Sequence, residues 1–252
     1  VDFAGVSWDV YQKGKRFFNV QSFAAMNMFN VPDNVTFPNP FELAQGGGDI
    51  NVQTLPQIMS GRGNGILDRT NLGDIYHTSA VYMDKWQNLN YFIAGGWSHT
   101  DPRGWDEMGN SLLTSWWGDL TSKDGFSVYV GTRYDLPDYG LKFGLEYNHG
   151  SEDWISFTPG NDDLYASKLA TRGNVYEAYT IWDIPGGEAV SKFGKAFIRL
   201  GYQYYQYDYT GSGYWLGSPV KLDELTSNPM NAQLYAPTDH ASEVYATFEA
   251  WF

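Results

Sequence analysis

Four histidines are the residues of this chain best suited to acid–base chemistry, and two of them have an acid nearby in sequence. Their possible partners are close in the chain: Ser98 and Asp101 for His99, and Asp239 and Ser242 for His240. A Ser-His-Asp site requires a nucleophile, a base and an orienting acid that converge in space. Proximity along the chain does not establish that convergence. We therefore expect His77, His99, His149 and His240 to be non-catalytic and predict no enzyme, with an outer-membrane hydrolase as one alternative.

Acidic residues form a second chemical set, because they gather in long polar segments between the predicted strands. They are Asp101, Asp106, Glu107, Glu152, Asp153, Asp162, Asp163, Asp223 and Glu224. Several carboxylates around one point are what Ca²⁺ binding requires, but the spacing of an EF-hand loop is not present. We favour a solvated acidic outer surface, and predict no metal site and no cofactor.

A third set of charged and polar residues recurs at every second position of predicted strands. It comprises Arg133, Asp135, Lys142, Glu146, Glu177, Lys195, Arg199, Gln203 and Glu249. If the opposite series faces lipid, these side chains point inward, which avoids the roughly 2–4 kcal/mol cost of Arg or Lys at a bilayer midplane. We predict that they line a lumen. An open passage for hydrated solutes and a closed interior filled by salt bridges are both compatible with this pattern.

The last eleven residues, Ser242–Phe252, show the alternation most clearly. Val244, Ala246, Phe248, Ala250 and Phe252 form one series, and more polar residues form the other. A period of two predicts a strand with one apolar face. Alternating apolar residues that end on an aromatic are typical of the closing strand of an outer-membrane barrel. We expect this series to be the signal that the barrel assembly machinery reads.

Similar alternation predicts nine strands in all, separated by short turns and long loops in strict succession. The strands are Val1–Tyr11, Phe17–Asn30, Ile75–Trp86, Asn90–His99, Phe126–Leu136, Leu141–His149, Val175–Ile184, Lys195–Asp208 and Ser242–Phe252. Outer-membrane barrels show this asymmetry, with short periplasmic turns and long extracellular loops. The predicted fold is therefore all-β, an antiparallel transmembrane β-barrel, and a soluble β-protein is the alternative. A strand or helix within Leu112–Leu120 is also considered.

Composition restricts the class of protein further. The 252 residues carry a net charge of −13, contain no cysteine and are 17% aromatic. Nucleic acid is not expected as a partner, because binding to phosphates needs a basic surface. The mean hydropathy of −0.42 and the lack of a long apolar run argue against transmembrane helices. Strands can still span a membrane, because only every second residue faces lipid.

Several stretches resemble an uncharacterised bacterial family of porin-like outer-membrane proteins, a domain of unknown function. They are Gly5–Tyr11, Asn30–Pro40, Asn71–Lys85, Ala94–Pro102, Gly144–Pro159, Lys168–Tyr179 and Gly201–Gly213. The resemblance implies an outer-membrane location and a barrel, and it supplies no activity. Members of this family are usually longer. Residues 1–252 are therefore expected to form a single barrel domain that is the C-terminal portion of a larger barrel.

The expected function is that of a porin-like channel for passive diffusion of small hydrophilic solutes or ions. We predict a narrowing by the long loop Val31–Asp74, and a weak cation preference from the acidic charge. A scaffold barrel that supports an extracellular or electron-transfer assembly is the main alternative. Nine strands are an odd number, so at least one further strand is expected from upstream or from another chain. The expected contacts are outer-membrane lipid and either further copies of the chain in a homo-oligomer or a partner protein.

Overall fold

The structure is a computed structural model that describes residues 1–29, 71–106, 109–115, 118–157, 167–185, 195–227 and 238–251. Most of these residues lie in strands. The strands are β1 (Asp2–Lys13), β2 (Arg16–Met28), β3 (Gly73–Trp86), β4 (Leu89–Pro102), β5 (Asn110–Ser111), β6 (Thr114–Ser115), β7 (Lys123–Leu136), β8 (Leu141–Gly150), β9 (Gly173–Asp183), β10 (Lys195–Tyr207) and β11 (His240–Trp251). Three short helices, η1 (Pro137–Tyr139), η2 (Lys168–Ala170) and α3 (Leu222–Ser227), complete the described elements.

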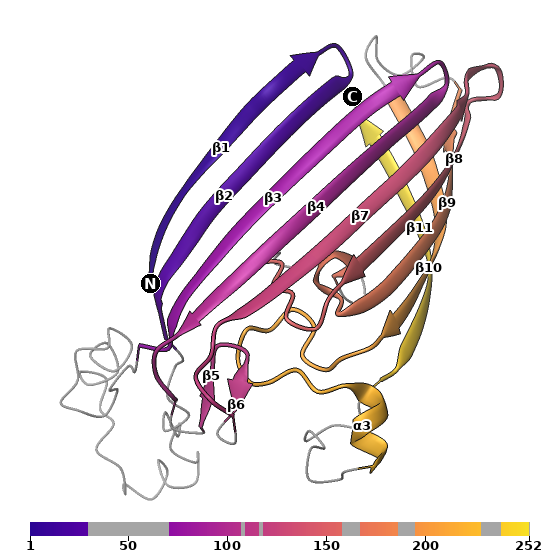
Figure 1. Ribbon diagram of the computed structural model, residues 1–252. Helices are drawn as coiled ribbons and strands as arrows, with labels where there is room; N and C mark the ends of the chain where they lie inside the picture. Colours follow the sequence, from indigo (N-terminus) through magenta and orange to yellow (C-terminus); the bar gives the residue numbers. More distant parts are fainter. Residues whose placement is uncertain are drawn as a thin grey trace, which may run out of the picture.

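Nine of the strands form one antiparallel sheet in which each strand pairs with the strands of that sheet that come before and after it along the chain; β5 and β6, which lie between β4 and β7, are not part of it. The order is β1-β2-β3-β4-β7-β8-β9-β10-β11 (Figure 1). All nine predicted strands are therefore confirmed, and the all-β class with them. Some begin earlier than predicted, as β7 does at Lys123. The segment around Leu112 contributes to β5 and β6, a separate two-stranded sheet that does not change the strand count of the main one.

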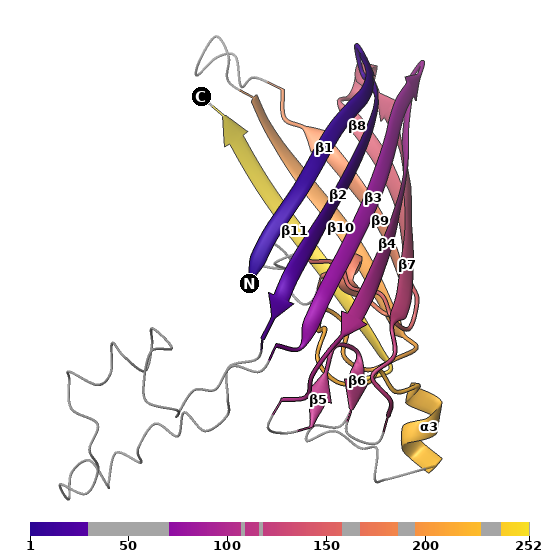
Figure 2. The same cartoon turned by 60° about the vertical axis from the view of Figure 1, so that its left-hand side comes forward.

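The main sheet curls into a trough but does not close into a barrel. Its free edges are β1 and β11, and no described strand joins them (Figures 1 and 2). One end of the trough carries short turns, at residues 14–15, 87–88 and 137–140. The other end carries the long connections. The chain starts at the loop end and its last strand finishes at the turn end, as an odd number of antiparallel strands requires (Figure 1).

The convex face of the sheet is apolar and exposed to its surroundings. Along β11, residues 242, 244, 246 and 248 are exposed, and the alternate residues 241, 243, 245 and 247 are half-buried. The relative exposure of Val244 is 83% and that of Leu145 is 64%. Other large convex-face side chains, including Trp97, Phe126, Trp182 and Tyr202, are also exposed. None of the described helices is long and apolar enough to cross a membrane.

The hydrophobic core lies on the concave side, at the loop end of the trough. Buried residues there are Ala25, Met28, Leu72, Ile75, Leu112, Leu113 and Ile155, with Phe157, Trp215 and Leu216 packed against them. Residues 151–157 and 167–172 contact the concave face, and residues 209–217 pack against them and the core; these three segments are called the plug below. The loop predicted to narrow the lumen, Val31–Asp74, lies outside the described residues except for its last four.

Candidate functional site on the concave face

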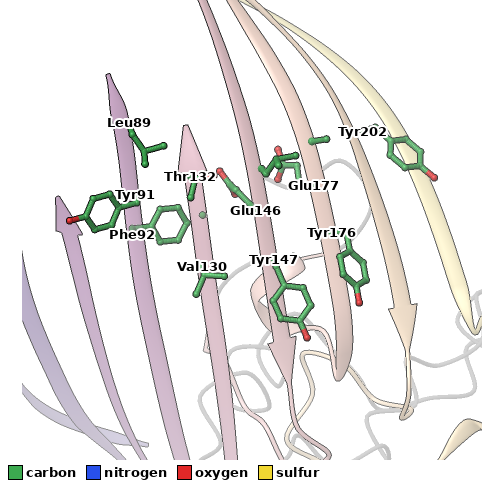
Figure 3. A pocket seen from close by; sticks show the side chains of 13 residues that line it. Leu89, Tyr91, Phe92, Val130, Thr132, Glu146, Tyr147, Tyr176, Glu177 and Tyr202 are labelled. Atoms are coloured by element: carbon green, nitrogen blue, oxygen red, sulfur yellow. The ribbon is translucent and has the colours of Figure 1, made fainter. Parts of the chain in front are cut away.

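The predicted lumen residues share one face of the sheet, because residues opposite each other in adjacent strands lie on the same side. Glu146 of β8 is opposite Glu177 of β9, which is opposite Gln203 of β10. Figure 3 shows Glu146 and Glu177 on neighbouring strands. The hollow of about 750 Å³ drawn there is lined mostly by residues of the opposite parity, such as Val130, Leu145 and Tyr176, so it lies mainly on the convex side. The same register places the other predicted lumen residues on the concave face: Arg133, Asp135, Lys142, Lys195, Arg199 and Glu249.

Glu177 is the centre of the largest ionic cluster on this face. Lys168 Nζ lies 2.7 Å from Glu177 Oε2, and Arg199 Nη2 lies 2.5 Å from Glu177 Oε1. Gln203 donates a hydrogen bond of 3.0 Å to Oε2, and the Tyr245 hydroxyl donates to Oε1. The side chain of Glu177 is only 1% exposed. Both of its carboxylate oxygens are therefore occupied by donors, which offsets the cost of burying the charge.

Lys168 joins this cluster to a second carboxylate. Its Nζ is 2.5 Å from Glu146 Oε2, and the Tyr129 hydroxyl donates to the same oxygen. Burial opposes the charge of Lys168, but Tyr129, Glu146 and Glu177 outweigh burial, so the pKa of Lys168 is raised. Because Lys168 belongs to the plug, this contact ties the plug to strands β8 and β9 of the wall.

Aromatic rings lie across the charged cluster. The guanidinium carbon of Arg199 is 3.9 Å from the centre of the Tyr179 ring and 5.4 Å from that of Tyr245. Gly144 makes room for the first ring, because a Cβ atom there would lie 2.1 Å from Tyr179. A cation over an aromatic face is stabilised by the ring quadrupole. The two tyrosine rings therefore shield the Arg199 charge from water and also stabilise it.

The remaining predicted residues fall into smaller groups nearer the turn end. Asp135 accepts hydrogen bonds from Arg133 at 2.8 Å, Asn90 at 2.9 Å and Lys85 at 3.1 Å. Lys142 pairs with Asp183 at 2.7 Å. Lys195 and Glu249 share the face but form no ion pair with any described residue. The structure thus brings together Glu146, Glu177, Arg199 and Gln203 in one cluster and Arg133 with Asp135 in another.

A buried arginine holds the plug together. Arg172 is 1% exposed and donates to the backbone carbonyls of Trp154 at 3.2 Å, Thr210 at 3.1 Å and Tyr214 at 2.7 Å. Burial lowers the pKa of Arg172 to about 10, so its guanidinium remains charged at neutral pH. The three carbonyls come from two loops far apart in sequence, and the arginine joins them.

Close packing fixes the plug against the sheet. The indole of Trp154 lies over Gly96, where an added Cβ would be 2.3 Å from the ring. Its ring also contacts His77, whose own ring stacks on Phe23 at 5.0 Å. Nearby, burial raises the pKa values of the Glu152 and Asp153 carboxyls. The plug therefore contains acids that are held partly out of water.

Among the described residues, we find no nucleophile hydrogen-bonded to His99, His149 or His240, as the hydrolase alternative would require. His99 Nδ1 lies 2.9 Å from Asp124 Oδ1, so its acid is a cross-strand neighbour and Asp101 is not its partner. Ser98 lies on the opposite face of β4, where its hydroxyl bonds to plug residues 153 and 155. His149 contacts Asn174 and His240 contacts Asp239. In the parts of the chain described, no hydroxyl hydrogen-bonds to any of these three rings.

The acidic loop residues form no evident metal site. Across the described ranges, no three His, Asp or Glu side chains are grouped closely enough to hold a metal ion. Glu107, Asp162 and Asp163 lie outside those ranges. Of the predicted assembly signal, Val244, Ala246, Phe248 and Ala250 lie on the convex face of β11, and Phe252 is not among the described residues.

Several members of the clusters were not predicted from the sequence. Tyr129 and Tyr245 share the period-two series of Arg133 and Glu249, so that signal was present. Lys85 and Asp183 likewise lie on strands at the right parity. Lys168 comes from an irregular segment, where no periodicity indicates its direction.

A family model described as "Protein of unknown function (DUF3373)" matches residues 1–252. No curated protein and no solved structure matches the chain.

Proposed function

The chain belongs to the DUF3373 family of proteins of unknown function, and we propose that it forms a wall section of an outer-membrane β-barrel channel. The observation that carries this proposal is the contrast between the two faces of the nine-stranded sheet. The charged side chains predicted to line a lumen share the concave face, and large apolar side chains are exposed along the convex face. Solutes or ions that are small and hydrophilic would pass along the concave side.

The convex face supports the membrane location. Large apolar residues remain exposed there on strands from both halves of the sheet, such as Ile93, Leu145 and Phe248. Such an extensive exposed apolar surface is unusual for a soluble protein and marks an interaction with lipid or protein. Tryptophan side chains at strand ends, such as Trp86 and Trp182, fit the aromatic belts of membrane barrels.

The concave face supports passage of polar solutes through a narrowed section. Its ion pairs are nearly balanced in sign, so we expect only a weak cation preference from the acidic net charge. The narrowing is assigned to the plug, because residues 151–157 and 167–172 contact the concave wall through Trp154 and Lys168.

The open edges imply further strands in the proposed barrel. An unpaired strand edge in lipid leaves backbone groups unsatisfied, at several kcal/mol for each group. Strands β1 and β11 run in the same direction, so direct pairing between them would be parallel. An odd number of added strands, from further chain or from a partner, closes the sheet with antiparallel pairs throughout.

Conductance across a planar bilayer tests the channel. The wild-type chain, reconstituted with whatever strands complete it, should give small and discrete conductance steps. Trp154→Ala removes the ring that packs on Gly96, and should give larger steps because the plug loses one of its contacts with the wall. Reversal potentials should show a weak preference for cations. Absence of conductance from both proteins, despite proven insertion, would count against a channel.

A scaffold barrel is the second candidate, and the well-packed plug is the observation that favours it. Buried Arg172 and the apolar core around Ile155 and Leu113 give the plug the character of a permanent structure. A scaffold predicts membrane insertion without conductance in both the wild type and Trp154→Ala. Binding of an extracellular partner to the loop end would then be the property to seek.

A further inference from the structure

The turn end of the sheet carries a basic pocket although the chain as a whole is strongly acidic. Lys13 ends β1, Lys15 occupies the two-residue turn, and Arg16 begins β2. These side chains and Lys85 line a cavity of about 340 Å³, together with Tyr11 and Asp84. Four cations and one carboxylate therefore line a single pocket, in a chain with 16 basic and 29 acidic residues.

The single carboxylate in the pocket is already satisfied. Asp84 Oδ2 lies 2.7 Å from Arg16 Nη2, and it also accepts from the hydroxyls of Tyr82 at 2.9 Å and Tyr91 at 3.2 Å. Its Oδ1 accepts the Lys85 backbone N–H at 2.7 Å. Asp84 thus has little capacity left to neutralise the other cations, and it holds the Arg16 guanidinium at the pocket wall.

The lysines differ in how far their charges are compensated. Lys85 Nζ pairs with Asp135 at 3.1 Å, on the concave side. Lys13 and Lys15 are exposed, and neither forms a salt bridge with a described residue. Lys13 is opposite Arg16 in the β1–β2 register, which keeps their backbones adjacent. Two uncompensated ammonium groups and a fixed guanidinium therefore surround one cavity.

From this arrangement we propose that the pocket binds a phosphate group. Arginine presents a planar fork that matches phosphate geometry, and lysine adds a point charge. The volume lies within the range of small-molecule sites. Two sources share this chemistry: a free phosphate anion and the headgroup of an anionic phospholipid. The lipid source rests on the proposed function, which places exposed Trp86 and Tyr11 of the same end at the level of the headgroups.

The first arm of the test measures the binding of inorganic phosphate to the full chain in a non-ionic detergent. The broadening of the ³¹P NMR line of phosphate reports this binding. The test variant is Lys13→Gln with Lys15→Gln. The matched control is Lys123→Gln with Lys221→Gln, which removes the same charge at the loop end. We expect the test variant to weaken binding about 10- to 30-fold and the control to leave it within about twofold.

The second arm separates the two sources of phosphate. Bilayer discs of phosphatidylcholine, with or without phosphatidylglycerol, are loaded with the same proteins. Displacement of free phosphate by phosphatidylglycerol, lost in the Lys13→Gln/Lys15→Gln variant, identifies the lipid headgroup as ligand. Binding of free phosphate that phosphatidylglycerol does not displace identifies a soluble anion at the same site.

Two results would overturn the phosphate site: equal weakening in the test and control variants, or no binding of either ligand to the wild type. If the proposed membrane function is wrong, the experiment gives a different result. The chain would then fail to enter any disc, including pure phosphatidylcholine, while the first arm in detergent would still decide whether the pocket binds phosphate.

Discussion

The middle of the sheet and its β1 edge have the same backbone structure but very different environments. On β9 and β10, concave residues such as Val175 and Tyr205 are buried, with relative exposures of 2% and 0%. On β1 every residue is exposed, and concave Phe3 is 67% exposed. The exposure of the concave residues differs because the plug contacts the middle strands and leaves β1 uncovered. A single sheet cannot bury its own face, so burial here depends on what the loops add.

The two regions also differ in the polar groups they carry. Near the edge, Asn19 donates to Asp9 at 2.8 Å and Ser7 at 3.2 Å, in a small network of short side chains. The middle carries the buried Glu177 cluster, in which two cations share one carboxylate. Charged clusters of this kind are costly unless every partner is in place. Damage to the middle should therefore have larger consequences than equivalent damage at exposed positions.

The largest effect is expected from Glu177→Ala. Removing this carboxylate leaves Lys168 and Arg199 partly buried without their main partner, and should lower the free energy of unfolding by about 3–5 kcal/mol. Lys142→Met is the control, because its partner Asp183 is 47% exposed. That variant should cost less than about 1 kcal/mol. Urea unfolding followed by tryptophan fluorescence measures both, and equal losses would show that the cluster is no more critical than a surface pair.

Two arginine substitutions, one on each face of β11, compare the two faces at the other free edge of the sheet. Ala246→Arg places a charge on the convex face at mid-strand, and Thr247→Arg places it on the concave face. If lipid covers only the convex face, the first variant should destabilise folding into bilayers by about 2–4 kcal/mol.

The concave-face variant Thr247→Arg should cost much less than Ala246→Arg. Equilibrium folding into lipid vesicles provides the measurement for this pair. Similar costs for the two variants would contradict the assignment of the convex face to lipid.

A methyl group added at Gly96 tests the contact between plug and wall. Its Cβ would lie 2.3 Å from the Trp154 ring, so Gly96→Ala should cost about 1–3 kcal/mol. Gly95→Ala is the adjacent control on the opposite face, where the nearest atom is 3.8 Å away. Unfolding free energies and protease cleavage within residues 151–157 should separate the two variants. No increase in cleavage for Gly96→Ala would show that Trp154 does not hold the plug.

The smallest effect concerns pH and the plug. Because burial raises the pKa of Asp153 above its ordinary value of 3.8, the folded plug favours the neutral acid. The contribution of neutral Asp153 to the stability of the folded plug is fully present below pH 3.8. It is lost as pH rises through the raised pKa of Asp153. Protease resistance of the plug should therefore decline over that interval.

Asp153→Asn should flatten this decline, because an amide does not titrate. Asp138→Asn, in the exposed turn η1, is the control and should leave the pH profile unchanged. An unchanged profile in Asp153→Asn would exclude this carboxyl as its source.

The sequence was sufficient to predict the nine strands and the common face of the charged residues in the predicted lumen set. Both depend on a period of two, which is a local property that Arg133, Glu177 and Glu249 display directly. The plug was not predicted, because an irregular segment carries no signal of the direction in which it folds. Lys168 and Arg172 were missed for that reason. The partner of His99 could not be predicted from proximity in sequence: strand register brings Asp124 to it, 25 residues away, although Asp101 is closer in sequence.

The nearest-neighbour order of the sheet has a consequence for how a gene encoding it can change in length. Because each strand pairs only with its sequence neighbours, a β-hairpin is the natural unit of insertion or deletion. Gaining or losing one hairpin preserves the direction and facing of all other strands. A single added strand would reverse every strand that follows it, and would move long loops to the side of the short turns. Length variants that keep this architecture should therefore differ by even numbers of strands.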